Sequence, residues 1–148
     1  MIRGSFGDTS GRPYIDGRLT IKRLKIVDYI RFCLDTGSDN CILLPTDSRK
    51  WKIDFNSLNQ TERQCSLNGV CDLYVEPAVI QFFEPRCFIY SYNIDLRIAP
   101  GTPEIEQLPS LLGRDILNHW AINYCKAKNR LNIKIMSATK IVPILGTP

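Results

Sequence analysis

Residues 29–40 read YIRFCLDTGSDN and carry the clearest structural signal in the chain. Apolar Ile30, Phe32 and Leu34 occupy every second position of the first half, and a two-residue period is the signature of a β-strand. The six residues that follow are small or polar and must form a loop. The sequence therefore predicts that a carboxylate, Asp35, lies at the point where a buried strand ends.

β-Structure is indicated along much of the remaining chain. A second short strand is expected over residues 41–44. Asn68-Gly69, between β-favouring residues, is a strong hairpin signal. Pro77, in the strand that follows, argues for an edge position or a bulge, because proline cannot donate a backbone hydrogen bond. Residues 88–98 alternate again and predict a long strand.

Only one segment changes to a helical period. Its apolar residues share one helical face, so a short helix is expected to begin near Gly113; these residues are Leu112, Ile116, Leu117 and Trp120. A last strand is expected over residues 131–135. The chain is therefore predicted to be all-β, with many short strands and one short C-terminal helix.

The length and the two ends of the chain suggest one domain with short extensions. A chain of 148 residues is expected to form a single hydrophobic core. Residues 1–12 are rich in glycine and small polar residues, and we expect them to form a flexible N-terminal arm. The domain is expected to cover residues 13–136, followed by a C-terminal tail over residues 137–148.

Composition argues against several classes of protein. With 44% hydrophobic and 23% charged residues, the chain is typical of soluble globular proteins. No apolar run approaches the ~20 residues of a membrane span. No signal peptide is visible after Met1, so a cytoplasmic location is expected. The net charge of +4 comes from scattered basic residues, so nucleic-acid binding is not expected. The aromatic residues of one expected strand are assigned to the core or a cleft wall rather than to a base-stacking platform; they are Phe88, Tyr90 and Tyr92.

Metal, cofactor and nucleophile chemistry find little support in the sequence. The six cysteines contain no C-x-x-C pair, and we expect them to be reduced thiols. The single histidine, His119, has no cysteine at a zinc-type spacing and no obvious serine or cysteine nucleophile beside it. No metal and no cofactor are therefore expected.

Three motifs together resemble the retroviral-type aspartic proteases, the retropepsin-like family that also has bacterial members. Leu34-Asp35-Thr36-Gly37-Ser38 looks like the catalytic loop of that family. Asn68-Gly69-Val70 lies where its flap tip would be, and Leu111-Leu112-Gly113-Arg114-Asp115 resembles its second signature. The resemblance covers residues 13–136, with the motifs in the family's order. It implies a closed β-barrel or sandwich that forms half of a two-fold dimer.

The resemblance also implies a reaction, the hydrolysis of peptide bonds by an aspartic endopeptidase. This chemistry needs two carboxylates, one as base and one as acid, and the chain contains one Asp-Thr-Gly. A homodimer in which the two copies of Asp35 meet at the axis supplies both. Two adjacent carboxylates cannot both ionise readily, so the pair would share one proton.

Further residues of the loop receive roles from the same resemblance. Thr36 would brace the two loops across the dimer axis, and Gly37 would offer its carbonyl group to the substrate. Ser38 would donate a hydrogen bond to the outer oxygen of the catalytic carboxylate. Asp39 would bind the backbone of the substrate, and Arg114 would pair with Asp39 to hold the loop.

The hairpin has an implied role in substrate binding. Asn68, Gly69 and Val70 would close over the bound peptide as a flap and exclude water. Gly69 would permit the tight turn at the tip, where a positive φ angle is expected. An ordinary hairpin turn has the same sequence signal, and the two interpretations are compatible.

Two alternatives remain open at the level of the sequence. The chain could be a catalytically silent module of the same fold that dimerises or binds peptides, since an intact Asp-Thr-Gly is necessary but not sufficient for activity. Asp-Thr-Gly also occurs in the phosphate loop of actin-like and sugar-kinase-like ATPases. That fold needs two α/β lobes and a much longer chain, and the sequence contains no second phosphate motif.

Overall fold

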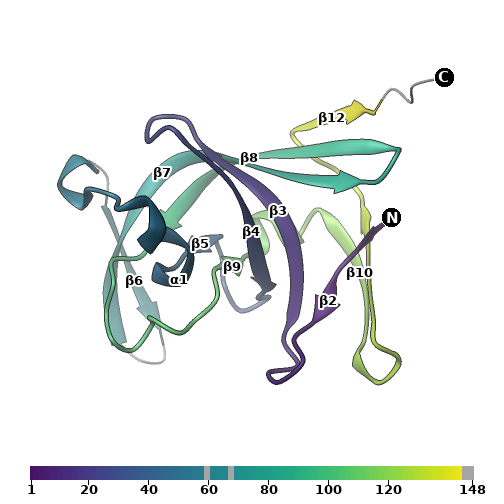
Figure 1. Cartoon of the computed structure of the whole chain (residues 1–148), viewed down its shortest axis with the longest axis horizontal. Coiled ribbons are helices and arrows are strands. Elements are labelled where there is room, and N and C mark those ends of the chain that lie inside the picture. Colours follow the sequence, from purple (N-terminus) through teal and green to yellow (C-terminus); the bar gives the residue numbers. More distant parts are fainter. Residues whose placement is uncertain (59–60, 67–68, 145–148) are drawn as a thin grey trace.

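The computed structural model describes residues 1–58, 61–66 and 69–144, and for residues 64–66, 69 and 70 it describes the backbone alone. Most of the regular structure is β (Figure 1). The main sheet closes on itself through the strands β3 (Pro13–Ile21), β4 (Ile26–Leu34), β5 (Ile42–Leu43), β7 (Gly69–Glu84), β8 (Phe88–Ile98) and β9 (Leu111–Leu112). Hydrogen-bonded neighbours follow the circuit β8–β5–β9–β4–β3–β7 and return to β8. The predicted all-β barrel is confirmed.

The interior of the barrel is filled by the apolar residues that the strand periods place on one face. Ile30 is 1% exposed and Phe32 is fully buried, as the alternation in residues 29–34 predicts. Phe82 packs edge-to-face on Trp120, with ring centroids 4.9 Å apart. Tyr92 is buried beside them, and its hydroxyl accepts a hydrogen bond from Trp120 Nε1 at 2.8 Å. Tyr90 and Tyr92 of β8 are therefore part of the core, as expected, whereas Phe88 is 39% exposed and does not belong to it.

The pairing of β9 with β4 and β5 brings two of the sequence motifs together. β9 lies between β4 and β5, parallel to the first and antiparallel to the second. Leu111 is opposite both Cys33 of β4 and Ile42 of β5. The loop that connects β4 to β5 therefore passes over the end of β9, where the helix α2 begins.

The helices are single turns. α2 (Arg114–Leu117) follows Gly113, as predicted, and it buries Ile116 and Leu117. Trp120 does not continue this helix, because it begins the strand β10 (Trp120–Cys125). A further turn that the sequence did not predict, α1 (Pro45–Ser48), follows β5, and the 3-10 turns are Arg49–Trp51, Phe55–Ser57 and Lys126–Lys128.

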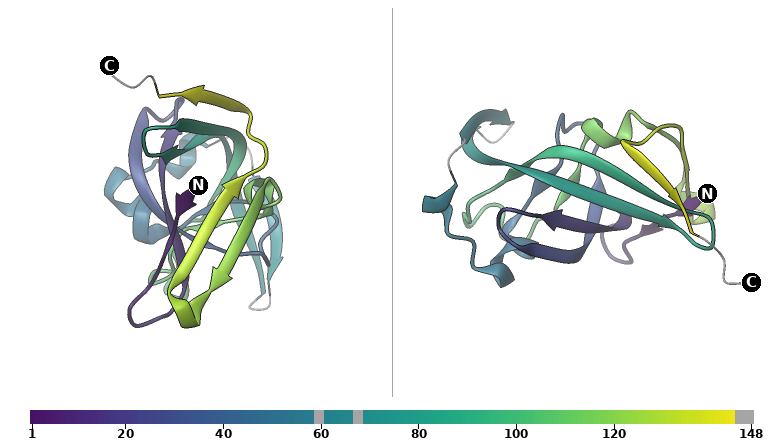
Figure 2. Two further views of the ribbon diagram at one scale, coloured as in Figure 1. Left: turned by 90° about the vertical axis from the view of Figure 1, so that its right-hand side faces the viewer. Right: turned by 90° about the horizontal axis from the view of Figure 1, so that it is seen from above.

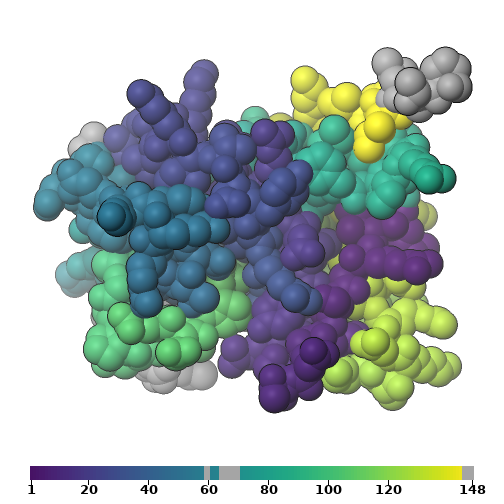
Figure 3. Space-filling model, viewed as in Figure 1, coloured from purple at the N-terminus to yellow at the C-terminus, as the bar shows by residue number. Residues whose placement is uncertain are grey.

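The N-terminal segment differs from the expected flexible arm. β1 (Ile2–Arg3) pairs with β11 (Arg130–Ile135), and β2 (Ser5–Phe6) pairs with β3. Figure 3 shows the first residues, in purple, lying against the yellow-green hairpin of β10 and β11. Ile2 and Phe6 are 6% and 7% exposed. These two isolated apolar residues are too few to produce a strand period, so the sequence signal was lost among their polar neighbours.

The C-terminal segment contains a strand that the sequence did not predict. β12 (Lys140–Pro143) pairs with Phe88–Ser91 at one edge of β8, so that it lies along the β7–β8 ribbon (Figure 2). All its residues are exposed. Without a buried face the segment has no alternation of apolar and polar residues, which is why it read as a tail.

One hairpin extends past the barrel. β6 (Thr61–Ser66) pairs with Gly69–Tyr74 of β7, whereas β8 pairs with β7 only from Tyr74 onward. Beyond this point Pro77 pairs with β8, and β3 joins the other side of β7 only from Val79. Pro77 thus lies where β7 has one neighbouring strand in the described structure, which agrees with the edge position expected for proline.

No helix in the described ranges is long and apolar enough to span a membrane.

Candidate active site

Asp35 lies directly after β4, at the position where the strand leaves the barrel. Its backbone N–H donates to the carbonyl oxygen of Leu112 at 3.0 Å, which ties it to β9. The N–H of Gly37 donates to Asp35 Oδ1 at 2.8 Å, and the N–H of Ser38 donates to the Asp35 carbonyl at 3.2 Å. The loop therefore turns around a half-buried carboxylate whose oxygen is already held by a backbone donor.

The loop is fixed from below by the start of α2. The N–H of Arg114 donates to the Ser38 carbonyl at 2.9 Å, and the N–H of Asp115 donates to the Asp39 carbonyl at 3.0 Å. The first N–H groups of a helix have no partner within the helix. Here they bind the carbonyl groups of the loop, so each of the two motifs satisfies the backbone of the other.

Gly113 permits this close approach. A Cβ atom at position 113 would lie 2.3 Å from the backbone carbon and oxygen of Asn40. No real Cβ atom tolerates such a distance, and the obstructing atoms are backbone atoms that cannot turn away. The glycine of the Leu111–Asp115 motif is therefore required because the two backbones touch.

A buried thiol and a carboxylate are hydrogen-bonded to each other at the end of the loop. Cys41 is fully buried, and its backbone N–H and its thiol donate to the two oxygens of Asp115, each at 3.0 Å. The N–H of Gly113 in turn donates to the Cys41 sulfur at 3.4 Å. Burial raises the pKa of the Cys41 thiol far above its usual range, and the charge of Asp115 raises this pKa further. Cys41 is therefore a neutral donor and not a reactive thiolate.

Sequence reasoning missed this pair. Cys41 was expected to be a reduced thiol and Asp115 a member of a motif, but nothing in the local sequence joins residues that are 74 positions apart. The only available signal was that Cys41 follows the loop of one motif and Asp115 ends the other motif, and the fold brings these two motifs together.

Arg114 and Asp39 lie together, as the family resemblance implies. The Arg114 guanidinium group forms an ion pair with Asp39 Oδ1, and its Nη1 donates to the Thr36 carbonyl at 3.5 Å. The two side chains are 48% and 75% exposed, so water screens the pair. The contact spans the loop from Thr36 to Asp39.

An apolar surface adjoins the loop. Leu44, Leu73 and Ala99 form a small buried cluster that is separate from the main core. Partly buried residues of β5 and β9 and of the segment before β9 pack against it: Ile42, Leu111 and Ile105. Since Ile42 and Leu111 lie opposite each other at the end of β4, this side of the loop offers apolar contacts.

Comparison with solved structures identifies the architecture. The crystal structure of a retropepsin-like aspartic protease from Rickettsia conorii matches with a TM-score of 0.61 and 20% sequence identity, over 97% of this chain and 92% of that chain. The chain has the retropepsin-like fold. EIAV protease in complex with the inhibitor HBY-793 matches with a TM-score of 0.47 and 16% identity, over 76% of this chain and 90% of that chain. No model of a protein family matches the sequence. No curated protein matches it either.

Within this retropepsin-like fold, Ser38 differs from its expected role. Its hydroxyl donates to the Asn40 carbonyl at 2.7 Å rather than to the Asp35 carboxylate. Thr36 and Gly37 are exposed at the tip of the loop, where they are accessible to another molecule. The expected flap residue Asn68 lies outside the described residues, and the backbones of Gly69 and Val70 begin β7.

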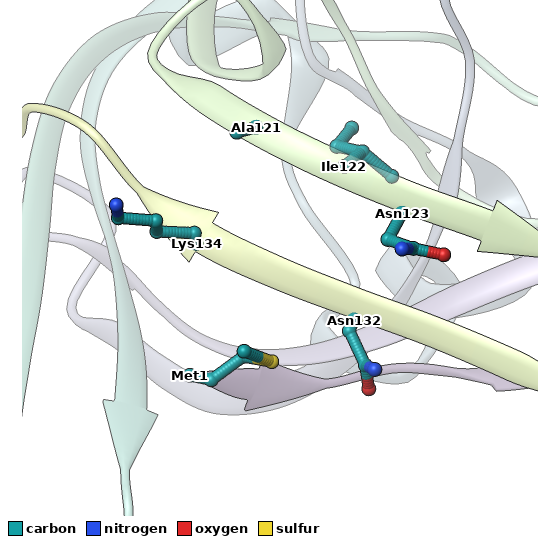
Figure 4. Close-up of a pocket in the computed structure, with 6 residues that line it drawn as sticks. All are labelled: Met1, Ala121, Ile122, Asn123, Asn132 and Lys134. Carbon is teal, nitrogen blue, oxygen red and sulfur yellow. The ribbon is translucent and has the colours of Figure 1, made fainter.

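Two hollows of the surface lie away from the Asp35 loop. One of about 260 Å³ lies on the sheet of β1, β11 and β10 (Figure 4) and is lined by Met1, Ala121, Ile122, Asn123, Asn132 and Lys134. Another of about 500 Å³ is lined mainly by outward-facing residues of β3, β7 and β8. Neither includes a residue of the Asp35 loop, and the first contains no carboxylate.

Among the described residues, no three side chains of His, Cys, Asp or Glu are arranged to hold a metal ion. His119 is exposed, and its Nδ1 lies 2.7 Å from the Ser137 hydroxyl oxygen.

Proposed function

We propose that the chain is an aspartic endopeptidase that acts as a homodimer, in which each subunit supplies Asp35 to one active site. The observation that carries this proposal is the anchoring of the Asp35 loop on β9 and α2 within a retropepsin-like fold. Such anchoring holds a carboxylate in a fixed position, and fixed geometry is what acid–base catalysis requires.

The neighbouring carboxylates support the need for a second chain. Asp39 is paired with Arg114, and Asp115 accepts hydrogen bonds from the backbone and thiol of Cys41. Both groups are therefore engaged in holding the loop. Because hydrolysis of an amide by this route requires a base and an acid, the partner of Asp35 is best supplied by the Asp35 of a second copy.

The proposed reaction uses the proton that the two carboxylates share. The ionised carboxylate removes a proton from water as the water oxygen attacks the peptide carbonyl carbon, and the protonated carboxyl group gives its proton to the carbonyl oxygen. The carboxyl group that took the proton from water then gives it to the departing nitrogen, while the other carboxylate removes a proton from a hydroxyl group of the tetrahedral intermediate, so that the C–N bond breaks and the shared proton is restored. The active form is singly protonated, so the rate is expected to follow a bell-shaped pH profile with its optimum below neutral pH.

The surrounding residues receive roles consistent with their positions. Thr36 and Gly37, exposed at the loop tip, would contact the partner loop and the peptide. Asp39, oriented by Arg114, would bind the peptide backbone. The hairpin residues Asn68, Gly69 and Val70 would cover the substrate.

The decisive experiment compares Asp35→Asn with Asp95→Asn on an internally quenched peptide library. Asp95 is exposed on β8, which makes it a matched control. In the proposed homodimer this substitution removes both carboxylates of the dyad, so kcat/KM should fall by about 1000-fold or more, since general acid and base steps each contribute ~100-fold or more. The control should stay within twofold, a chelator should leave activity intact, and statine-type mimics should compete.

Two results would contradict the proposal. One is turnover by Asp35→Asn at the wild-type rate. The other is a sedimentation profile that contains only monomer in a sample that cleaves peptides. A stable dimer that binds peptides without cleaving them would instead identify a silent module of the same fold.

A further inference from the structure

The β6–β7 ribbon, defined as Thr61–Ser66 with Gly69–Tyr74, is joined to the rest of the molecule at its base, where Leu73 packs with Leu44 and Ala99. In the described structure β6 pairs with β7 alone, and β8 joins β7 only from Tyr74 (Figure 1). A two-stranded ribbon is marginally stable by itself in water. Contacts at its base must therefore determine the direction in which it leaves the barrel.

One ion pair joins the ribbon to the barrel across the strand between them. Glu62 of β6 is opposite Leu73, and Arg97 of β8 is opposite Val75. Leu73 and Val75 are two residues apart on β7 and therefore face the same side, as do Glu62 and Arg97. Arg97 Nε and Nη2 both donate to Glu62 Oε2, at 3.0 and 2.5 Å.

The arginine of this pair is held firmly in place. The Arg97 side chain is 14% exposed, whereas that of Glu62 is 42% exposed. Arg97 Nη1 also donates to the carbonyl oxygen of Asp95 at 2.5 Å, so its planar group is bound on two sides. A partly buried arginine that makes several charge-assisted hydrogen bonds is a more effective anchor than a solvated one.

Arg97 is also connected to the loop that carries Asp35. Its backbone N–H donates to the carbonyl oxygen of Cys41 at 3.1 Å, and it is opposite Ile42 of β5. Cys41 directly follows the loop and is fixed by Asp115. The residue that holds the base of the ribbon is therefore bonded to the end of the candidate catalytic loop.

A second ion pair in the ribbon provides a contrast. Arg63 and Asp72 are directly opposite each other on β6 and β7, and their side chains are 74% and 62% exposed. This pair lies entirely within the ribbon and is screened by water. It can add slightly to the ladder, but it cannot set the angle between the ribbon and the barrel.

We propose that Glu62 and Arg97 are positioning residues that fix the β6–β7 ribbon relative to the Asp35 loop. Their ion pair holds the ribbon at its base, near Tyr74. The backbone hydrogen bond from Arg97 to Cys41 connects this base to the end of the Asp35 loop. The consequence for turnover rests on the proposed protease function, whereas the mechanical consequence for the ribbon does not.

The test measures amide hydrogen exchange in full-length Glu62→Gln, Arg97→Lys and Arg63→Gln. Without its charge-assisted partner, the ribbon in Glu62→Gln should open more often, and exchange over residues 61–66 and 71–74 should accelerate by about tenfold. Arg97→Lys keeps the charge but loses the two-donor geometry, so an intermediate acceleration is expected. Arg63→Gln should stay within twofold of wild type, and amides of β3 and β4 should not change in any variant.

Peptide kinetics add a second measurement. A misdirected ribbon weakens binding of substrate and transition state alike, so KM should rise by about fivefold in Glu62→Gln while kcat changes less than twofold. Unchanged exchange in Glu62→Gln, or equal acceleration in Arg63→Gln, would overturn the proposal. If wild-type protein cleaves no peptide, the exchange data still decide the role of the pair, and only the protease function fails.

Discussion

The Asp35 loop and the β6–β7 ribbon are held in different ways. The loop is bonded at its start to Leu112, along its length to α2, and at its end to Asp115. Among the described residues, the ribbon has its own ladder, the packing of Leu73 with Leu44 and Ala99, and one ion pair to the barrel, Glu62–Arg97. Stability is not uniform within a protein, and segments with few buried contacts open at low cost. The fold thus joins a rigid element that carries the carboxylate to an adjustable one.

The largest effect is expected where the two backbones of the rigid region touch. Gly113→Ala places a Cβ atom 2.3 Å from the Asn40 backbone. Neither backbone segment can move away from this clash without losing its hydrogen bonds. We expect the free energy of unfolding to fall by about 3 kcal/mol or more in a urea titration. Gly101→Ala is the control, because its nearest neighbour, Pro45 Cγ, would lie at an ordinary 4.0 Å. Equal stability of the two variants would show that the loop is not held against β9.

Local patterns were sufficient to predict the strand before Asp35, the loop after it and the start of the helix α2. The strand was predicted from the alternation of Ile30, Phe32 and Leu34, which arises because one face of the strand is buried. The loop was predicted from the polar residues that follow. The glycine at position 113 marked the start of a helix. Each of these signals depends on a few consecutive residues, and physical burial produces them directly.

The contacts that fix the site could not be read in the same way. β9 has two residues, which is too short for a period, and its position between β4 and β5 depends on pairing with residues about 70 positions away. The Cys41–Asp115 contact and the Glu62–Arg97 pair also join residues that are far apart in the sequence. Such contacts follow from the closure of the barrel, which no local pattern encodes.

The rates at which cysteines are alkylated compare the Asp35 loop with the β6–β7 ribbon, and this test does not depend on peptidase activity. Cys41 is fully buried beneath the loop with a raised thiol pKa, whereas Cys71 is exposed on the ribbon. A raised pKa means less thiolate at a given pH, so both burial and charge slow alkylation. With iodoacetamide at pH 8, Cys71 should be modified at least ~100-fold faster than Cys41, as followed by peptide mass spectrometry. Comparable rates would mean that the loop opens as readily as the ribbon.

Removal of Asp115 should loosen the loop by a smaller amount. Asp115→Ala leaves the buried N–H of Cys41 without its acceptor, which is expected to lower the free energy of unfolding by about 2 kcal/mol. Asp115→Asn keeps a carbonyl oxygen for this N–H and should lose less than about half as much. Urea titration of both variants measures the difference. An equal loss in both would assign the effect to the charge rather than to the hydrogen bond.

The smallest change in the free energy of unfolding is expected for Ser38→Ala. This variant also tests whether the Ser38 hydroxyl binds the Asn40 carbonyl or the Asp35 carboxylate. The Ser38 hydroxyl donates to the Asn40 carbonyl, so Ser38→Ala should lower the free energy of unfolding by about 1 kcal/mol. It should also leave the pH profile of peptide hydrolysis unchanged, because the hydroxyl does not bind the Asp35 carboxylate.

The family resemblance suggested the opposite arrangement for this hydroxyl. A hydroxyl that donates to a carboxylate stabilises the charged form and lowers its pKa, so its removal would move the acidic limb of the profile to higher pH. Such a shift in Ser38→Ala would show that the serine turns toward Asp35 in the working enzyme. An unchanged profile with reduced stability would assign Ser38 to the rigid frame of the loop, together with Gly113 and Asp115.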